Sequence, residues 1–414
     1  MRIERIDNGW SRPPQSADVE ESVRGILDEV TAGGDAAVLE LTERFDHAEL
    51  GPEQLRVDAH ELEASIGVLE SAVLDGLRTA IDNVRAVARE QLREPSALEL
   101  AQGHSVEIAE IPVRRAAIYV PGGEAPYPST VVMGAVTARV AGVDEIVVCA
   151  PPGPGGRAHP VILAACVLCE LHEVYRMGGA QAIAALAYGT ESVRRVDVIV
   201  GPGNPYVQEA KRQLAWTHVG IDGIAGPSEL AVLAAGDGVD PELIALDLLA
   251  QSEHGKNSPL WLLSPDRALL EAVVGAVERL EDGRPSTRDA DLQVISTRSL
   301  GDALTIAEGI APEHLELVGG DAEALADRVR FAGCLFVGRG AATAFGDYVA
   351  GSNHVLPTGG AARFGSALSP ATFRRRMARV SLPGEAPARL APAGAALARA
   401  EGFPVHAESM ERRA

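Results

Sequence analysis

Short apolar runs alternate with helical stretches through most of the chain. A first set of runs lies at 116–121, 145–150, 173–178 and 197–201, and a second set lies at 230–235, 259–264, 292–297 and 334–338. Strands that alternate with helices are typical of βαβ units, whose strands pair in parallel. The pattern therefore predicts an α/β protein with two parallel-sheet βαβ domains.

The residues before the first apolar run favour helices. Ser16 is a candidate N-cap, and the glycines at 33–34 predict the end of the first helix. A longer helical segment is expected from about 60 to 92. The apolar face of the first helix is expected to hold Val19, Val23, Ile26, Leu27 and Val30.

These patterns divide the chain into four parts. Residues 1–15 are expected to be an N-terminal arm. Residues 16–115 and 230–368 are expected to form one α/β domain, in which the helical N-terminal part packs on the later sheet. Residues 116–229 are expected to form the other α/β domain. In the tail, residues 369–414, basic residues and five prolines interrupt what could only be short helices, so we expect it to dock on another surface, such as a second subunit.

Composition narrows the function classes. Hydrophobic residues make up 46% and charged residues 23% of the 414 positions, as in soluble globular proteins. A formal net charge of −21 argues against nucleic acid or an anionic membrane as a partner. No apolar run has the length of a membrane span, and MRIERIDNGW is unlike a signal peptide, so we expect a cytoplasmic protein.

The cysteines offer no evident chemistry. Cys166 and Cys169 form a CxxC inside an apolar helical run, and no second pair completes a zinc site. We interpret them as small buried hydrophobic residues. No cysteine lies in a turn beside a histidine, so a thiolate nucleophile has no candidate.

Two loops between strands and helices have the composition of ligand-binding turns. They are VPGGEAPYPST at 120–130 and IVGPGNPYVQEAKRQ at 199–213. In the second, Asn204 is suited to the N-cap and Pro205 to the first helical position, where free backbone N–H groups favour a phosphate. Neither loop is the GxGxxG fingerprint, so the sheets are expected to be incomplete Rossmann-like units. An ordinary strand-to-helix turn remains an alternative for each loop.

Several polar residues have the chemistry of a metal site. The stretch DLLAQSEHG places Gln251 and His254 three positions apart at a helix end, on one face. Asp347 lies in a glycine-rich loop and His406 in the tail. Together they offer two nitrogens and two oxygens, a plausible set of zinc ligands. Spacing alone does not bring them together, so solvated loops remain an alternative.

An acid and a base stand side by side in APEHLELV, where Glu313 precedes His314. Such a pair can share proton transfers. Two solvated polar side chains in a loop are the simpler alternative.

Several long motifs, in order from about 113 to 406, resemble histidinol dehydrogenase. They include VRRAAIYVPGG, GGAQAIAALAYGTESV, VDVIVGPGNPYVQEAKRQ, AGPSEL, LLAQSEHG, APEHLEL and GDYVAGSNHVLPTGGAARF. The resemblance implies oxidation of L-histidinol to L-histidine in two NAD-dependent steps through an enzyme-held aldehyde. It also implies one zinc ion per subunit and an intertwined homodimer.

Matching motif to motif, the resemblance implies roles for individual residues. The zinc ligands would be Gln251, His254, Asp347 and His406. NAD would contact Tyr119, Gln181 and Asn204, which makes 116–229 the NAD-binding domain. The substrate would contact Ser228, Gln251, His254, His314, Asp347, Glu401 and His406, with His354 in the surrounding pocket. Glu401 and His406 would reach across from the partner subunit.

The same resemblance implies a mechanism. His314 would act as general base on the alcohol while hydride leaves to NAD. Glu313 would then activate water to attack the aldehyde, and a second NAD would accept the second hydride. Water attack requires no cysteine nucleophile, which agrees with the unremarkable cysteines.

Three alternatives differ in substrate or chemistry. The first is an NAD-dependent dehydrogenase of another polar alcohol, such as a sulfonated diol. An anionic substrate would need added Arg or Lys, whereas Glu401 and Asp347 suit a cation. The second is a zinc hydrolase in which Glu313 activates water without a nucleotide. The third is a ligand-binding protein without turnover, against which the intact Glu313 and His314 argue.

Overall fold

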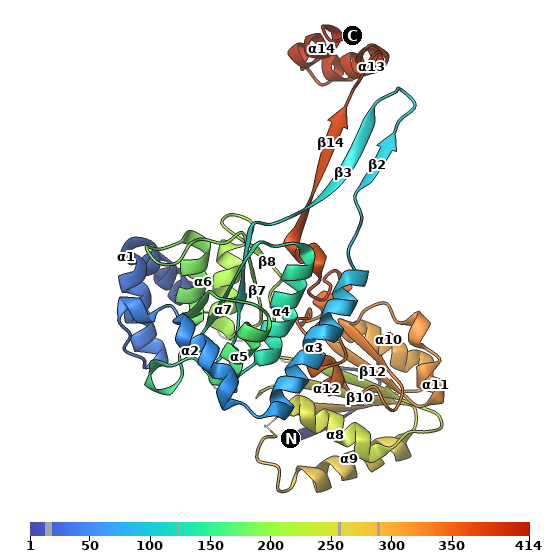
Figure 1. The fold of residues 1–414 in the computed structure, drawn as a ribbon. Helices are drawn as coiled ribbons and strands as arrows, with labels where there is room; N and C mark the ends of the chain where they lie inside the picture. The colour runs from blue at the N-terminus through green and yellow to red at the C-terminus, as the bar shows by residue number, and fades with distance from the viewer. Residues whose placement is uncertain (13–18, 123–124, 256–257, 288–289) are drawn as a thin grey trace.

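Two parallel sheets and a projecting antiparallel arm make up the chain (Figure 1). The computed structural model describes residues 1–12, 19–122, 125–255, 258–287 and 290–414. The prediction of an α/β protein with two parallel sheets is confirmed. The candidate N-cap Ser16 lies outside the described residues.

The five-stranded sheet has the order β6-β5-β4-β7-β8, and all its strands are parallel. Numbered along the chain, this order is 3-2-1-4-5, which is the Rossmann order without its sixth strand. Helices cover both faces. The strands are β4 (Arg115–Tyr119), β5 (Glu145–Ala150), β6 (Val174–Arg176), β7 (Val198–Val200) and β8 (Gly220–Ile221), and the helices between them are α4 (Pro128–Ala141), α5 (Pro160–Leu168), α6 (Gly179–Tyr188) and α7 (Pro205–Leu214).

The six-stranded sheet repeats the same plan. Its order is β1-β11-β10-β9-β12-β13, so its last five strands in sequence again follow the order 3-2-1-4-5. The strands are β9 (Leu230–Ala234), β10 (Pro259–Ser264), β11 (Asp291–Ser296), β12 (His314–Val318) and β13 (Cys334–Val337), and the helices are α8 (Pro241–Ser252), α9 (Arg267–Glu281), α10 (Leu300–Ile310), α11 (Gly320–Glu323) and α12 (Thr343–Tyr348).

The expected N-terminal arm contains the sixth strand of this sheet. Strand β1 (Arg2–Asp7) pairs in parallel with β11 at the sheet edge. None of its residues is fully buried, because an edge strand packs few side chains on either face. The apolar signal of this segment is therefore too weak to predict a strand from sequence.

The expected packing of the N-terminal helices on the later sheet is wrong. Helix α1 (Glu20–Asp46) packs on α6 and α7, and α3 (Ser71–Glu90) packs on α4, so both cover the five-stranded sheet. An apolar stripe shows that a helix packs on something but does not select between two sheets. The predicted glycine break is confirmed within α1, at Gly34 with φ 55°, whereas the single helix expected at 60–92 is divided into α2 (Ala59–Ala64) and α3.

Helix α6 shows how deeply the five-stranded sheet is enclosed. Nearly every residue of α6 is buried, because the sheet covers one side and α1 the other. The CxxC helix α5 is similar, and burial raises the pKa of the Cys166 thiol. Within the described part of the chain, no helix is both long and apolar enough to cross a bilayer.

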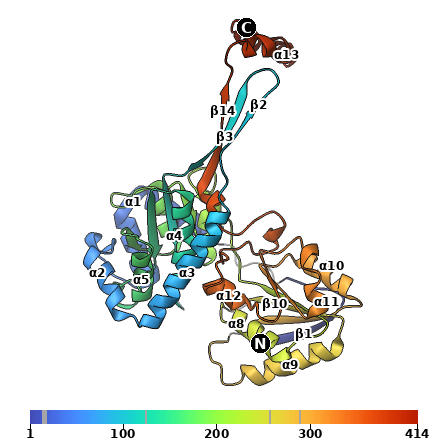
Figure 2. The same cartoon turned by 45° about the vertical axis from the view of Figure 1, so that its right-hand side comes forward.

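The arm joins two segments that are far apart in sequence. Strand β3 (Ser105–Pro112) pairs with β2 (Ser96–Glu99) on one side and with β14 (Arg374–Ser381) on the other. This antiparallel sheet leads away from the body to α13 (Ala386–Ala400) and α14 (Pro404–Glu411) (Figures 1 and 2). The expectation of only short helices in the tail is wrong, because the tail forms β14 and the 15-residue helix α13 with Pro392 inside it. Its arginines stabilise the strand by pairing across it, as in Arg376 with Glu110 at 2.7 Å.

Candidate active site

The polar residues singled out from sequence gather at one edge of the six-stranded sheet. Ser228 precedes β9, while Glu313 and His314 stand at the start of the neighbouring strand β12. A helix that follows a parallel strand runs back to the edge where that strand began. Gln251 therefore lies in the last turn of α8, His254 lies just beyond that helix, and Asp347 lies on α12, all at the same edge.

Asp347 stands between two imidazoles. One carboxylate oxygen lies 3.8 Å from His254 Nε2 and the other lies 3.9 Å from His314 Nε2. These separations are too long for hydrogen bonds. Two ligand atoms bound to one tetrahedral zinc lie about 3.4 Å apart, given metal–ligand distances near 2.1 Å. The spacing of His254 and Asp347 therefore fits a cation between them.

Gln251 is linked to Glu313 through Ser228. The Gln251 Nε2 donates to the Ser228 hydroxyl at 2.7 Å, and that hydroxyl donates to Glu313 Oε2 at 2.6 Å. These hydrogen bonds use the amide nitrogen of Gln251. The carbonyl oxygen of Gln251, which is the amide atom that can bind a metal, stays available to a cation. The donors of Gln251, His254 and Asp347 thus fit three positions of a zinc site.

Glu313 and His314 are both held in their neutral forms by burial. Glu313 is 6% exposed, and burial raises its pKa to about 8, although Ser228 and the Glu229 amide donate to it. Burial likewise lowers the pKa of His314, and the Asp347 charge opposes this. His314 Nδ1 lies 2.9 Å from the Glu229 carbonyl oxygen, which can only accept, so Nδ1 carries the proton. The unprotonated Nε2 faces Asp347 and can accept a proton.

Glu229 organises this acid–base pair and was missed by the sequence reasoning. Its amide donates to the Glu313 carboxylate at 2.8 Å, its carbonyl accepts from His314, and its own carboxylate accepts from the Glu313 amide at 3.3 Å. Arg12 neutralises it at 3.0 Å. A charged residue directly before the apolar strand 230–235 is the signal that could have identified it.

His354 links the backbone of Asp347 to helix α4, which covers the five-stranded sheet. Its Nδ1 donates to the Asp347 carbonyl oxygen at 2.9 Å, and its Nε2 lies 3.4 Å from the Thr130 hydroxyl on α4. Burial lowers the pKa of His354, which keeps the ring neutral. The residue therefore supports the backbone of Asp347 from the side of the five-stranded sheet.

The three candidate NAD contacts lie at the carboxyl edge of the five-stranded sheet. Tyr119 ends β4, Gln181 lies in the first turn of α6, and Asn204 caps α7 by accepting from the Val207 amide at 3.1 Å. Strands β4 and β7 flank the point where the strand order reverses, which is where open α/β sheets bind ligands. The predicted N-cap of α7 at Asn204 is confirmed.

Close packing fixes the turns at this edge. The Gly179 amide donates to the Tyr119 hydroxyl at 3.1 Å. Gly201 has φ 120°, and a Cβ there would lie 2.1 Å from the Tyr119 carbonyl oxygen, so only glycine fits. Asp46, a residue the sequence reasoning missed, accepts from Gln181 Nε2 at 3.4 Å, and burial raises its pKa to about 6.

Glu401 and His406 are not part of this cluster within one chain. Both are exposed: Glu401 directly follows α13 and His406 lies on α14. These helices lie at the far end of the arm, distant from α8 and α12 (Figures 1 and 2). Among the described residues, no three His, Cys, Asp or Glu side chains come together as a metal site. A single chain therefore gathers Gln251, His254 and Asp347 without the fourth expected ligand.

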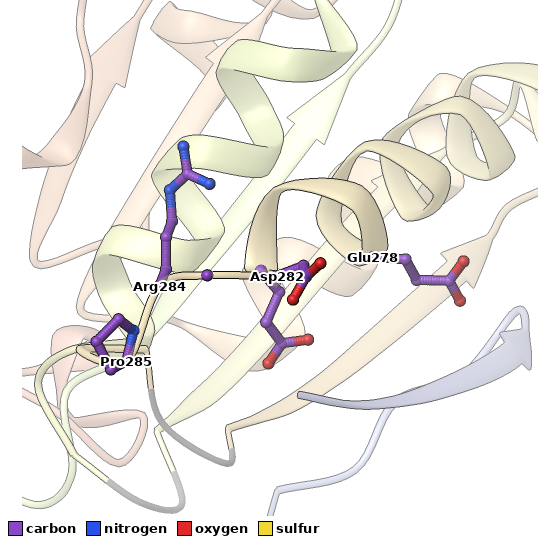
Figure 3. A pocket seen from close by; sticks show the side chains of 6 residues that line it. Glu278, Asp282, Arg284 and Pro285 are labelled. Carbon is purple, nitrogen blue, oxygen red and sulfur yellow. The ribbon is translucent and has the colours of Figure 1, made fainter.

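One surface hollow of the described residues lies away from this cluster. It measures about 510 Å³ at the end of α9 and is lined by acidic side chains, with Arg284 and Pro285 (Figure 3). None of the predicted site residues lines it. The charged side chains around this hollow are solvated and do not converge on one point. We therefore assign the candidate active site to the edge of the six-stranded sheet.

Comparison with known proteins shows the family of this chain. The profile of the histidinol dehydrogenase family matches residues 11–414. The chain belongs to the histidinol dehydrogenase family. The histidinol dehydrogenase of Cereibacter sphaeroides is 47% identical over 405 residues, which are 96% of this chain and 92% of that protein. That of Gluconobacter oxydans is 42% identical over 409 residues, which are 97% and 94% of the two chains.

A solved structure shares the fold. The crystal structure of histidinol dehydrogenase from Elizabethkingia anophelis matches with a TM-score of 0.93 at 31% identity, and the match covers 99% of this chain and 97% of that one. The predicted family membership is thus confirmed, and the chain is a dehydrogenase. The arm and tail belong to the shared fold, because the match leaves almost no residue out.

Proposed function

We propose that this chain oxidises L-histidinol to L-histidine, with two NAD molecules accepting two successive hydrides. The observation that supports this most strongly is the convergence of Gln251, His254 and Asp347 with the buried pair Glu313 and His314 at one sheet edge. Histidinol is a cationic amino alcohol with an imidazole, and the carboxylates of this edge suit a cation. The proposal places the reaction at the end of histidine biosynthesis.

Gln251, His254 and Asp347 would hold one zinc ion, with His406 as the fourth ligand. When bound, zinc would supply a Lewis acid that attracts the substrate amine and imidazole. Fixing the substrate in this way places its carbinol carbon in one orientation, and positioning of this kind removes several kcal/mol from a barrier, on the order of 7–11 in favourable cases.

His314 would accept the proton of the substrate hydroxyl. Its Nε2 is unprotonated because Nδ1 donates to the Glu229 carbonyl, and burial keeps the ring neutral at physiological pH. As hydride leaves to NAD, the alcohol becomes the aldehyde. The neutral starting form of His314 is the form that a general base needs.

Once it has lost its own proton, Glu313 would remove a proton from water in the second step. The resulting hydrate of the aldehyde would give its hydride to a second NAD, which yields the carboxylate. The Ser228 hydroxyl donates to Glu313 and holds it toward the site. Because burial raises the pKa of Glu313 to about 8, the carboxyl holds and releases a proton near physiological pH.

NAD would bind along the carboxyl edge of the five-stranded sheet. Tyr119, Gln181 and Asn204 line this edge at the reversal of strand order. The amide groups at the start of α7 are suited to the pyrophosphate.

Two chains would form a dimer by exchanging their tails. Within one chain α13 and α14 pack on each other through a small core of Ala395, Ala398 and Ala407, while Leu397, Phe403 and Val405 are each more than half exposed. Three alanines bury too little apolar surface to stabilise such a unit alone. A partner body that covers these side chains would also receive Glu401 and His406.

The stoichiometry of NADH tests the proposed reaction. Purified protein with zinc and NAD would be given L-histidinol, and NADH and histidine would be counted. We expect two NADH for each histidine. One NADH with an aldehyde product would contradict the role of Glu313, and no NADH from histidinol, with turnover of an anionic alcohol, would contradict the substrate.

A further inference from the structure

Helices α8 and α12 are joined through strand β12 by a buried polar cluster that the proposed reaction does not use. Glu316, in the middle of β12, is 1% exposed. Its Oε1 accepts from the Thr343 amide at 2.9 Å and from the Thr343 hydroxyl at 2.6 Å, both on α12. Its side chain also lies beside the carboxyl of Asp247 on α8, and the two groups line one small cavity. One side chain therefore contacts both helices.

The link between Glu316 and Asp247 requires a proton. Glu316 Oε2 is buried and meets no donor group among the described residues. Two carboxyl groups hydrogen-bond only when one of them is protonated, because a carboxylate can only accept. Burial raises the pKa of Glu316 to about 8 and that of Asp247 to about 6, which agrees with one shared proton at neutral pH.

The cluster is unsuited to a ligand. Its cavity lies between α8 and the carboxyl ends of β12 and β13, and the corresponding edge of the other sheet holds the candidate NAD contacts. The cavity there is only about 10 Å³, close to the space of a single water molecule. Its lining includes Asp240, Asp247 and Glu316, with Arg339 paired to Asp240. Such a small acidic cavity cannot accept a nucleotide, so the role of the cluster is internal.

On each of the two helices, the residue of the polar cluster lies one turn before a candidate zinc ligand. Asp247 precedes Gln251 by four residues on α8, and Thr343 precedes Asp347 by four residues on α12. Residues four apart lie on the same helical face, one turn from each other. Whatever fixes Asp247 against Thr343 thus fixes the separation of Gln251 and Asp347.

We propose that Glu316 is a positioning residue, which clamps α8 to α12 through one shared proton and so sets the distance between the zinc ligands Gln251 and Asp347. The inference rests on the proposed zinc site. Groups that orient metal ligands without touching the metal change metal affinity by about 10–100-fold when they are replaced. We expect a loss in this range when the clamp is removed.

The test compares two replacements of Glu316 in the full-length protein. Glu316→Leu removes the links to both helices. Glu316→Gln keeps them, since its amide oxygen can accept from Thr343 and its NH₂ can donate to Asp247. The Zn²⁺ affinity of each protein would be measured by competition with a chromophoric chelator, and thermal unfolding would be recorded beside it. We expect a loss of about 10–100-fold for Glu316→Leu and a change below about threefold for Glu316→Gln.

Two further variants complete the comparison. Asp247→Leu breaks the same link from the α8 side and serves if Glu316→Leu does not fold; we expect the same weakening. Asp240→Asn removes one charge from the same cavity but keeps an N-cap residue on α8, so its Zn²⁺ affinity should match the wild type.

The outcomes separate this inference from the proposed function. Wild-type protein that binds no Zn²⁺ at all would contradict the zinc site, and the inference with it. Wild-type binding with unchanged affinity in a folded Glu316→Leu or Asp247→Leu protein would overturn the clamp alone. An equal loss in Glu316→Gln and Glu316→Leu would also overturn it, because the shared proton would then not be the link.

Discussion

Replacing Glu313 by glutamine in zinc-free protein should remove a large pH-dependent loss of stability. Glu313 is buried, and burial raises its pKa from 4.5 to about 8. A carboxyl whose pKa is higher in the folded state stabilises the fold while it is protonated. This contribution is fully present below pH 4.5 and disappears as the pH rises through about 8.

The size of the effect follows from the two pKa values. They differ by about 3.5 pH units, and each unit corresponds to about 1.36 kcal/mol, so wild-type protein should lose about 5 kcal/mol between pH 4.5 and 8 relative to the glutamine variant. Glutamine has nearly the same shape, and its oxygen can still accept from Ser228 and the Glu229 amide. The variant should therefore match the wild type at pH 4.5 and exceed it progressively above.

The assay is urea denaturation of chelator-treated protein at several pH values, with tryptophan fluorescence as the signal. Glu253→Gln, at an exposed carboxylate beside the same site, controls for the loss of one negative charge. The difference in stability between Glu313→Gln and wild type should grow from about zero at pH 4.5 to several kcal/mol at pH 8. Parallel pH curves for the two proteins would refute the assignment of Glu313 as a buried carboxyl that is neutral at neutral pH.

Three further predictions concern single residues. Glu313→Gln in the zinc-loaded enzyme should slow histidinal oxidation by about 10²–10⁴-fold and histidinol oxidation much less, as measured by separate assays of the two substrates; equal losses would contradict its role. His314→Gln should slow histidinol oxidation by about 10²–10⁴-fold at unchanged zinc content, and a loss confined to histidinal oxidation would contradict its assignment. Asn204→Ala should cost about 1 kcal/mol through loss of the α7 cap and raise the KM for NAD, with zinc affinity unchanged; an unchanged KM would contradict the NAD site.

The sequence predicted the sheets because buried parallel strands have a strong signal. Runs such as 145–150 and 259–264 are apolar at nearly every position, and in the structure both faces of these strands are covered. The strands β1 and β14 were missed for the opposite reason. Their residues are largely exposed and charged, so pairing with a neighbour, not burial, makes them strands.

Individual residues of the candidate site could be predicted from sequence, but the residues that position them could not. Gln251, His254, Glu313 and His314 stand in polar motifs that differ from the apolar helices and strands around them. Glu229 and Glu316 lie beside or within apolar strands, and their partners are hundreds of residues away or on another helix. Their importance comes from contacts that only the folded chain creates.

The tail shows a further limit. Its proline-rich sequence indicated that it needs a partner surface, and its exposed Leu397, Phe403 and Val405 agree with that interpretation. No sequence pattern indicated the antiparallel arm that extends the tail. The arm forms because β14 pairs with β3 over eight residues, although the two strands are separated by more than 250 positions.

Mixed dimers test the central claim, an active site built from two chains around one zinc ion. His254→Ala and His406→Ala proteins should each be inactive. When the two proteins are unfolded together and refolded, half of the dimers should be hybrids. In each hybrid one of the two active sites has both histidines, so about a quarter of wild-type activity should return. A mixture that forms dimers and stays as inactive as either variant alone would contradict the exchange of tails.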